Sequence, residues 1–261
     1  MRANVPSYEV IAPYDLAHAL SLLPDYRPLA GGTDVMVLFE AGKLEHRRWQ
    51  SILHLSELRG ITASPDFVTL GALTTYSDLR RSDLLASEFP LLVEAAVQIG
   101  GIATQNRGTI GGNIVNASPA ADTPPALLVY SAEVELTSRR GFRWVPYVSF
   151  HTGYKQMDLA PDELLTRIRL PRGVRPEKYS YRKVGTRRAQ AISKVCFAAT
   201  YVGDAIRIGL ASVAPTPLLV EATRDDARER LEAALVPIDD IRSTAAYRRR
   251  VALNLLEDFL A

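Results

Sequence analysis

Two short segments that join adjacent glycines to polar residues are the strongest candidates for chemistry in this 261-residue chain. The first is Ala30-Gly31-Gly32-Thr33-Asp34, and the second is Thr109-Ile110-Gly111-Gly112-Asn113. Because glycine has no Cβ, such a backbone can adopt positive φ and approach a ligand closely. Successive N–H groups in such a turn form a concave anion site, to which Thr33 adds a hydroxyl donor. Each segment alone is more often a structural turn, and only the pair suggests a phosphate cradle.

A third candidate is Asp122, which lies in a run of turn-forming and small polar residues from about 105 to 125. Long connections of this kind are often functional. The carboxylate could accept hydrogen bonds from sugar hydroxyls, or it could simply cap a helix that begins at Pro124. Neither glycine segment matches the G-x-G-x-x-G fingerprint or the Gly-Lys-Ser/Thr phosphate loop, so a nicotinamide-type Rossmann domain is not supported.

Hydrophobic periodicity predicts the elements that position these segments. A short strand at 28–30 enters the first glycine segment, a helix at 35–40 leaves it, and a buried helix at 87–99 precedes the second. Further expected elements are a helix at 15–23, strands at 52–55 and 67–73, and a hairpin formed by 132–137 and 142–145.

The C-terminal part has a different pattern beyond a linker at Pro171–Pro176. We expect a hairpin of 195–201 with 206–210, then helices at 225–235 and 245–260, the last capped by Ser243 or Thr244. Strands followed by helices indicate the α+β class. The expected domains are residues 1–174, with parts at about 1–57 and 58–174, and residues 175–261. The run Arg248-Arg249-Arg250 is interpreted as a solvated helix face.

Composition excludes several classes of protein. The 31 basic residues nearly balance the 29 acidic ones, which argues against a nucleic-acid or membrane surface. No apolar run is long enough to span a bilayer, and the first six residues lack the apolar core of a signal peptide, so we expect a cytoplasmic location. Cys196 is the single cysteine and the four histidines are scattered, so we expect no metal site in this chain.

Several motifs resemble the FAD-binding subunit of molybdenum hydroxylases, the relatives of xanthine dehydrogenase and aerobic carbon monoxide dehydrogenase. They lie in the same order along nearly the whole chain: residues 29–34, 107–113, 118–122, 150–154, 162–165, 181–185, 191–193 and 214–217. The resemblance implies a two-part FAD-binding domain of the vanillyl-alcohol-oxidase/MurB type. A small α+β domain with a three-stranded antiparallel sheet and helices would follow it.

The resemblance also implies residue roles. The first half of a diphosphate cradle would be the backbone N–H groups of Leu29, Ala30, Gly31, Gly32, Thr33, Asp34, Val35 and Met36. The second half would be Thr109, Ile110, Gly111, Gly112 and Asn113. Asp122 would bind sugar or ribityl hydroxyls. Leu164 and Lys183 would lie near the flavin ring, where the lysine's charge would favour the anionic reduced form. Ile99 stands where some relatives place an aromatic ring, so stacking is not expected there.

The function implied is electron transfer, with no catalytic acid or base in this chain. Electrons would come from 2Fe-2S clusters of an iron–sulfur small subunit, fed by a molybdenum large subunit, and would leave to an external acceptor. The assembly expected is a dimer of heterotrimers. Alternatives are a self-contained flavin oxidoreductase of the same superfamily and a module that has lost its cofactor. Gly32→Val or Gly111→Val is predicted to abolish FAD retention, because a β-branched side chain resists positive φ.

Overall fold

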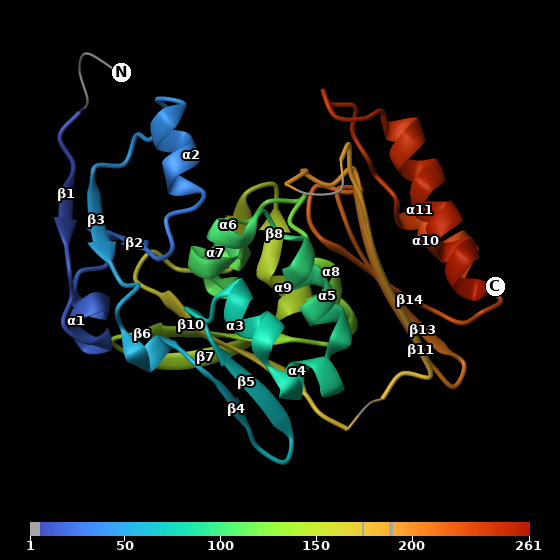
Figure 1. Ribbon diagram of the computed structural model, residues 1–261, viewed down its shortest axis with the longest axis horizontal. Helices are drawn as coiled ribbons and strands as arrows, with labels where there is room; N and C mark the ends of the chain where they lie inside the picture. The colour runs from blue at the N-terminus through green and yellow to red at the C-terminus, as the bar shows by residue number, and fades with distance from the viewer. Residues whose placement is uncertain (1–5, 174, 188–189) are drawn as a thin grey trace.

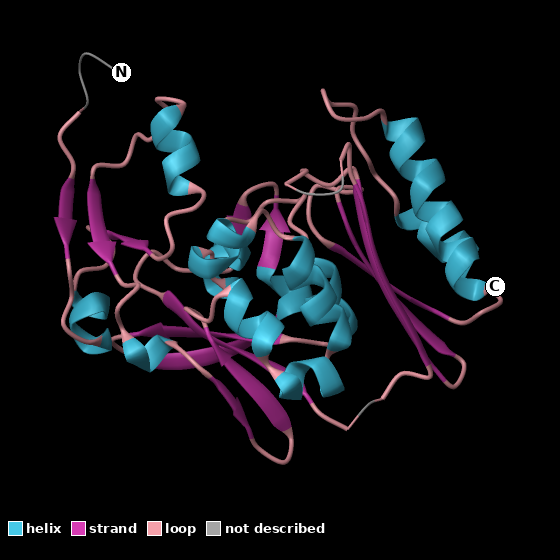
Figure 2. Ribbon diagram, viewed as in Figure 1, coloured by secondary structure: helices cyan, strands magenta, loops and turns pink. Residues whose placement is uncertain are grey.

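The computed structural model describes residues 6–173, 175–187 and 190–261. The strands of these residues form four β-sheets (Figure 1). The expected absence of a signal peptide falls largely on residues 1–5, and the expected domain boundary falls on residue 174. Both lie outside the described residues. The helices gather mainly between the sheets and on the outer side of the last one (Figure 2).

The N-terminal sheet is parallel, in the order β1 (Glu9–Ile11), β3 (Arg48–Ser51), β2 (Arg27–Leu29). Its crossovers carry α1 (Leu16–Ser21), capped by Asp15, and α2 (Val35–Glu40). The predicted strand and helix around the first glycine segment are thus confirmed. The prediction of a strand at 52–55 is wrong, because β3 ends at Ser51. Residues 52–55 form a turn in which the Leu55 N–H donates a hydrogen bond to Ile52 O. Ile52 and Leu55 are apolar because this turn packs into a hydrophobic cluster.

The central sheet has five antiparallel strands, joined to the N-terminal sheet through a short 3-10 helix at Ser56–Leu58. Their order is β4 (Ile61–Ala63), β5 (Phe67–Gly71), β10 (Leu164–Pro171), β6 (Glu133–Ser138), β7 (Gly141–Pro146). The strand near 67–73 and the hairpin of β6 with β7 are confirmed. A two-stranded hairpin, β8 (His151–Gly153) with β9 (Gln156–Met157), follows α9 (Tyr147–Phe150).

Short helices cover this central sheet and build the largest core (Figure 2). They are α3 (Tyr76–Arg81), α4 (Asp83–Glu88), α5 (Pro90–Gln98), α6 (Ile102–Arg107), α7 (Ile110–Val115) and α8 (Pro124–Val129). The single helix predicted at 87–99 is divided, because Pro90 starts a new helix and forces Phe89 out of helical geometry. The stretch from 105 to 125 is not one long loop: α6 ends and α7 lies within it.

The C-terminal sheet is antiparallel in the order β11 (Lys178–Val184), β12 (Val195–Val202), β13 (Ala205–Ala211), β14 (Leu218–Ala222). The expected three strands are therefore wrong, since β14 adds a fourth. The five residues of β14 come directly after Pro215 and Pro217, and Val220 is the only one of the five that is buried. The strand is therefore too short to show an alternation of apolar and polar residues in the sequence. The α+β class is confirmed.

Successive side chains of β12 point to opposite faces of the sheet, so that one face packs on the C-terminal helices and the other on the central core. Val195, Phe197 and Ala199 pack against α10 (Ala227–Ala234) and α11 (Ala245–Leu260), whereas Cys196 and Ala198 belong to the central core. A Cβ on Gly209 of β13 would lie 2.3 Å from Pro125 O, so this glycine permits the close approach of α8. The C-terminal sheet is therefore packed tightly on the central helices.

Candidate cofactor site

The two glycine segments, 75 residues apart in sequence, meet directly in the structure. The first joins β2 to α2, and the second begins α7, with Thr109 as its N-cap. Arg107 Nε donates to Gly31 O at 3.1 Å, and a Cβ on Gly31 would lie 1.8 Å from Arg107 O. Gly31 is therefore required by the contact between the two backbones. The sequence proposal that these segments form two halves of one structure is consistent with this geometry.

The first segment presents a row of free backbone donors. Within the described residues, none of the N–H groups from Gly31 to Val35 has a hydrogen-bond acceptor. Gly32 has φ of +74°, the left-handed region that favours glycine, and a Cβ there would meet only Leu29 Cδ1 at 3.8 Å. Consecutive unpaired N–H groups around such a turn form an anion-binding concavity, as predicted for this segment.

The second segment differs from its prediction. Ile110 N–H donates to Thr74 O, Gly111 N–H to Ala72 O, and Gly112 N–H to Thr109 Oγ1. Neither glycine has positive φ, because both lie in the first turn of α7. The interpretation of this segment as a second row of free donors is wrong, as is the positive-φ reason given for Gly111. Gly111 is small because a Cβ would lie 2.7 Å from Ala72 Cβ.

Gly112 is not held as glycine by a close backbone contact or by positive φ. A Cβ there would meet one described atom within 4 Å, Thr109 Oγ1 at 2.9 Å, which is part of a side chain. A helical position normally favours alanine over glycine by about 1 kcal/mol. A diphosphate bound between α7 and the first segment would require open space of this kind.

A side-chain relay missed at the sequence level ties the two segments together. Asn116 Nδ2 donates to Asp34 Oδ1 at 3.2 Å, and Lys155 Nζ donates to Asn116 O at 2.6 Å and to its Oδ1 at 3.0 Å. Lys155 lies at the tip of the β8–β9 hairpin with φ of +58°. The local signal that could have found it is the turn Gly153-Tyr154-Lys155, which places a lysine at a hairpin tip.

Asp122 and Lys183 form a buried ion pair at a second part of the site. Lys183 Nζ lies 2.6 Å from Asp122 Oδ2 and donates to Gln98 O at 2.9 Å. Burial raises the pKa of the Asp122 carboxyl, and the lysine's charge opposes that shift. The helix-cap interpretation of Asp122 is wrong, since Thr123 is the N-cap of α8.

Two other predicted residues lie in different surroundings. Ile99 is the C-cap of α5, next to Gln98 and hence beside the Asp122–Lys183 pair, and its side chain is buried in the central core. Leu164, at the start of β10, packs instead in the cluster that includes Leu73 and Ala30 of the N-terminal part. The structure therefore groups Asp122, Lys183 and Ile99, and places Leu164 in a separate apolar cluster against which Ala30 also packs.

A family model for the FAD binding domain in molybdopterin dehydrogenase matches residues 6–173. The chain belongs to this family. A putative xanthine dehydrogenase FAD-binding subunit of Escherichia coli is 35% identical over 215 residues, covering 78% of this chain and 73% of the relative. The carbon monoxide dehydrogenase medium chain of Hydrogenophaga pseudoflava is 30% identical, covering 97% and 95%. The family recognised from the sequence motifs is confirmed.

Solved structures agree with this assignment. A crystal structure of a Cu,Mo-CO dehydrogenase in its cyanide-inactivated form contains a chain with a TM-score of 0.91 and 30% identity. The match covers 98% of this chain and 97% of that one. The described architecture, an FAD-binding domain followed by a domain with a four-stranded antiparallel sheet, is thus that of the molybdopterin dehydrogenase family.

The residues present fit an FAD molecule in two independent ways. The free N–H groups of the first segment suit a diphosphate, and the Cβ position of Gly112 on α7 has one described atom within 4 Å, the Thr109 hydroxyl oxygen. Asn113 Oδ1 and Asp122 Oδ1 are buried without a partner among the described residues. Unpartnered buried acceptors are rare in folded proteins, and hydroxyl donors of a sugar or ribityl chain would satisfy them.

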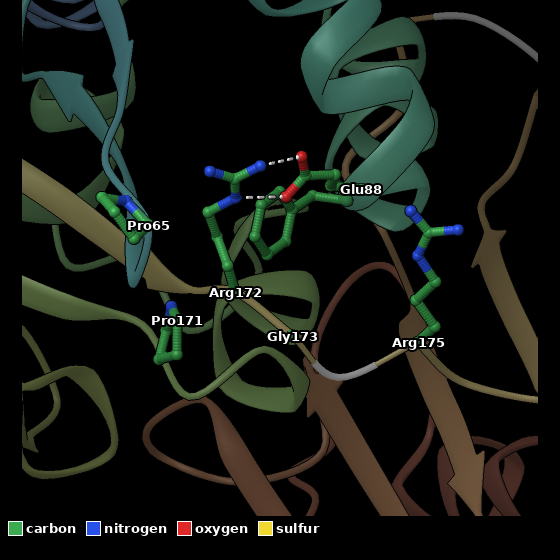
Figure 3. A pocket seen from close by; sticks show the side chains of 7 residues that line it. Pro65, Glu88, Pro171, Arg172, Gly173 and Arg175 are labelled. Atoms are coloured by element: carbon green, nitrogen blue, oxygen red, sulfur yellow. Dashed lines mark hydrogen bonds and ion pairs between the residues drawn. The ribbon is translucent and has the colours of Figure 1, made fainter.

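A cavity elsewhere in the molecule is lined by none of these residues. It has a volume of about 270 Å³ and lies between α4 and the segment that follows β10 (Figure 3). Arg172 bridges to Glu88 there through two hydrogen bonds of 2.8 and 2.7 Å, and its Nη1 donates to Ser64 O. These bonds anchor the end of β10, and Arg175 stands apart from the pair in this view (Figure 3).

Among the described residues, no group of three or more His, Cys, Asp or Glu side chains is placed to hold a metal ion. No helix within those residues is long and apolar enough to cross a membrane.

Proposed function

We propose that this chain is the electron-transfer subunit of a molybdenum hydroxylase complex. In that role it would accept electrons from the 2Fe-2S clusters of a small subunit and pass them to an external acceptor. A large subunit would hold the molybdenum cofactor, and the assembly would be a dimer of heterotrimers. We also propose that the chain divides into an FAD-binding domain, residues 1–174, and a C-terminal domain, residues 175–261.

One observation carries the proposal: the free N–H groups of residues 31–35 lie beside the second glycine segment. FAD, once bound, would supply a two-electron store that can be filled one electron at a time. Gly31, Gly32, Thr33 and Asp34 would hold its diphosphate through the backbone. Leu29, Ala30, Val35 and Met36 would complete this half of the cradle. Thr109, Ile110, Gly111 and Gly112 would line the other half, where the N–H groups of Ile110, Gly111 and Gly112 already have acceptors within the chain.

The buried polar groups would orient the cofactor's other parts. Asn113 Oδ1 and Asp122 Oδ1 would accept hydrogen bonds from hydroxyl groups. Lys183 would hold positive charge near the flavin ring while it neutralises Asp122. Leu164 and Ile99 would supply apolar surface. None of these groups is arranged as an acid–base pair for a substrate, which favours electron relay over a self-contained flavin oxidoreductase.

Absorbance spectroscopy separates these two functions. The FAD-loaded chain alone and the complex purified from its native source are each mixed with candidate hydroxylase substrates without oxygen. The proposal predicts that the visible flavin band bleaches in the complex and not in the isolated chain. Substrate-dependent bleaching in the isolated chain, or native purification as a fully active monomer, would contradict the proposal. A Gly112→Ala chain is the matched cofactor-poor control.

A further inference from the structure

Arg248 was expected on a solvated helix face, and the structure places it in the interior. The residue is 2% exposed. Its Nη1 donates to Ser212 O at 2.9 Å and to Lys194 O at 2.8 Å, and its Nη2 donates to Asp240 Oδ1 at 2.7 Å. Burying an arginine requires compensation for its lost hydration, so a set of three acceptors indicates a specific positional role.

The residue that Arg248 holds, Ser212, has an unfavourable backbone conformation. Its φ of +70° lies in the left-handed region, which costs a non-glycine residue about 1 kcal/mol. This conformation directs Ser212 N–H to Pro119 O at 2.7 Å. Ser212 Oγ donates to Ser193 O at 3.0 Å, and the two hydroxyls lie 3.2 Å apart. Strain of this kind persists where the surrounding contacts fix it.

These contacts end on residues 118–122, the loop that carries Asp122. Pro119 O accepts from Ser212 N–H, Ala120 O accepts from the Ser193 hydroxyl at 3.0 Å, and Asp122 O accepts from the Tyr181 hydroxyl at 2.9 Å. All three donors come from the C-terminal sheet and its connections. The loop's backbone is therefore held from outside the segment that matches the FAD-binding family model, which ends at residue 173.

We propose that Arg248 is a positioning residue for the cofactor, acting through Ser212 and Ser193 on the loop that carries Asp122. The C-terminal domain then completes the FAD site by fixing the carboxylate whose Oδ1 is unpartnered. This inference rests on the proposed role of Asp122 in FAD binding. It adds a mechanical link between α11 and the cofactor, so that whatever displaces α11 alters flavin binding and potential.

The test compares Arg248→Met with Arg250→Met, an exposed arginine two residues along the same helix. FAD dissociation constant, flavin reduction potential and hydrogen exchange of the cofactor-free chain are measured for both. We expect Arg248→Met to weaken FAD binding about tenfold, the effect of one lost hydrogen-bonded group, and to shift the potential. Exchange at Ser212 and at loop 118–122 should accelerate. Arg250→Met should match the unaltered chain.

Two further variants cover the case in which Arg248→Met fails to fold. Ser193→Ala removes the bond to Ala120 O, and Ser212→Gly removes a hydroxyl while retaining the left-handed backbone. Both should weaken FAD binding severalfold and shift the potential, a change that loss of global stability alone would not produce. Wild-type affinity and potential in Arg248→Met, or in both serine variants, would overturn the inference. If the unaltered chain bound no FAD, the proposed function would fail, and hydrogen exchange would still decide the mechanical link.

Discussion

Replacing Gly31 and Gly112 separately with alanine should distinguish a glycine needed by the fold from one needed by the ligand. In Gly31→Ala, the new Cβ would lie 1.8 Å from Arg107 O, whereas ordinary contact begins at 3.4 Å. The two segments must therefore separate by 1.6 Å, the difference between these distances. Overpacking and a weakened Arg107–Gly31 bond together should cost about 3 kcal/mol of unfolding free energy.

Gly112→Ala should behave differently, because its Cβ meets only the Thr109 hydroxyl at 2.9 Å. The helical preference for alanine offsets that contact, so its unfolding free energy should stay within about 1 kcal/mol of the unaltered chain. Its methyl group would occupy the diphosphate's space, and FAD affinity should fall about tenfold or more.

Urea unfolding of the cofactor-free chain and FAD titration by fluorescence quenching measure both quantities. Loss of FAD is expected in both variants, and loss of stability in Gly31→Ala alone. Wild-type FAD affinity in Gly112→Ala would refute the argument that the space beside this glycine belongs to the diphosphate. Wild-type stability in Gly31→Ala would refute the close backbone contact.

Two further predictions concern the polar groups of the site. Lys183→Met should retain FAD at a lower reduction potential, measured by dye equilibration. Because burial raises the pKa of Asp122, the folded state binds this proton more readily than the unfolded state, and the stability that this group contributes falls as pH rises. The loss of unfolding free energy in Lys183→Met should therefore be larger at about pH 8 than at about pH 5. An equal loss at both pH values would contradict the ion pair of Lys183 with Asp122. Lys155→Ala should lower FAD affinity about threefold by freeing Asn116 and leave stability within about 0.5 kcal/mol, with the exposed Lys43→Ala as its control. Unchanged affinity would remove the hairpin relay from the site.

The sequence was sufficient for elements whose signal is local. The helix at Val35–Glu40 and the hairpin of β12 with β13 follow from periodicity and turn residues. The cap of α11 is Thr244, one of the two predicted residues. The motifs also sufficed for the family, because several short matches in order are specific even where each is weak.

Long-range contacts could not be predicted this way. Nothing local to Gly31 or Gly111 shows that one touches Arg107 O and the other Ala72, so positive φ was the wrong reason for Gly111. Arg248 resembles its neighbours in sequence, and only the positions of Ser212 and Asp240 make it buried. The partnership of Asp122 with Lys183 likewise joins positions 61 residues apart. In each of these three cases the acceptor or obstacle lies on another element.

Titration of FAD into the purified, cofactor-free chain measures directly whether this chain holds the cofactor. We expect saturable binding of one FAD per chain, abolished or strongly weakened in Gly112→Ala, with the exposed Lys43→Ala as the control. Absence of saturable FAD binding, or equal binding by the Gly112→Ala and Lys43→Ala chains, would show that this chain does not hold FAD in the proposed cradle.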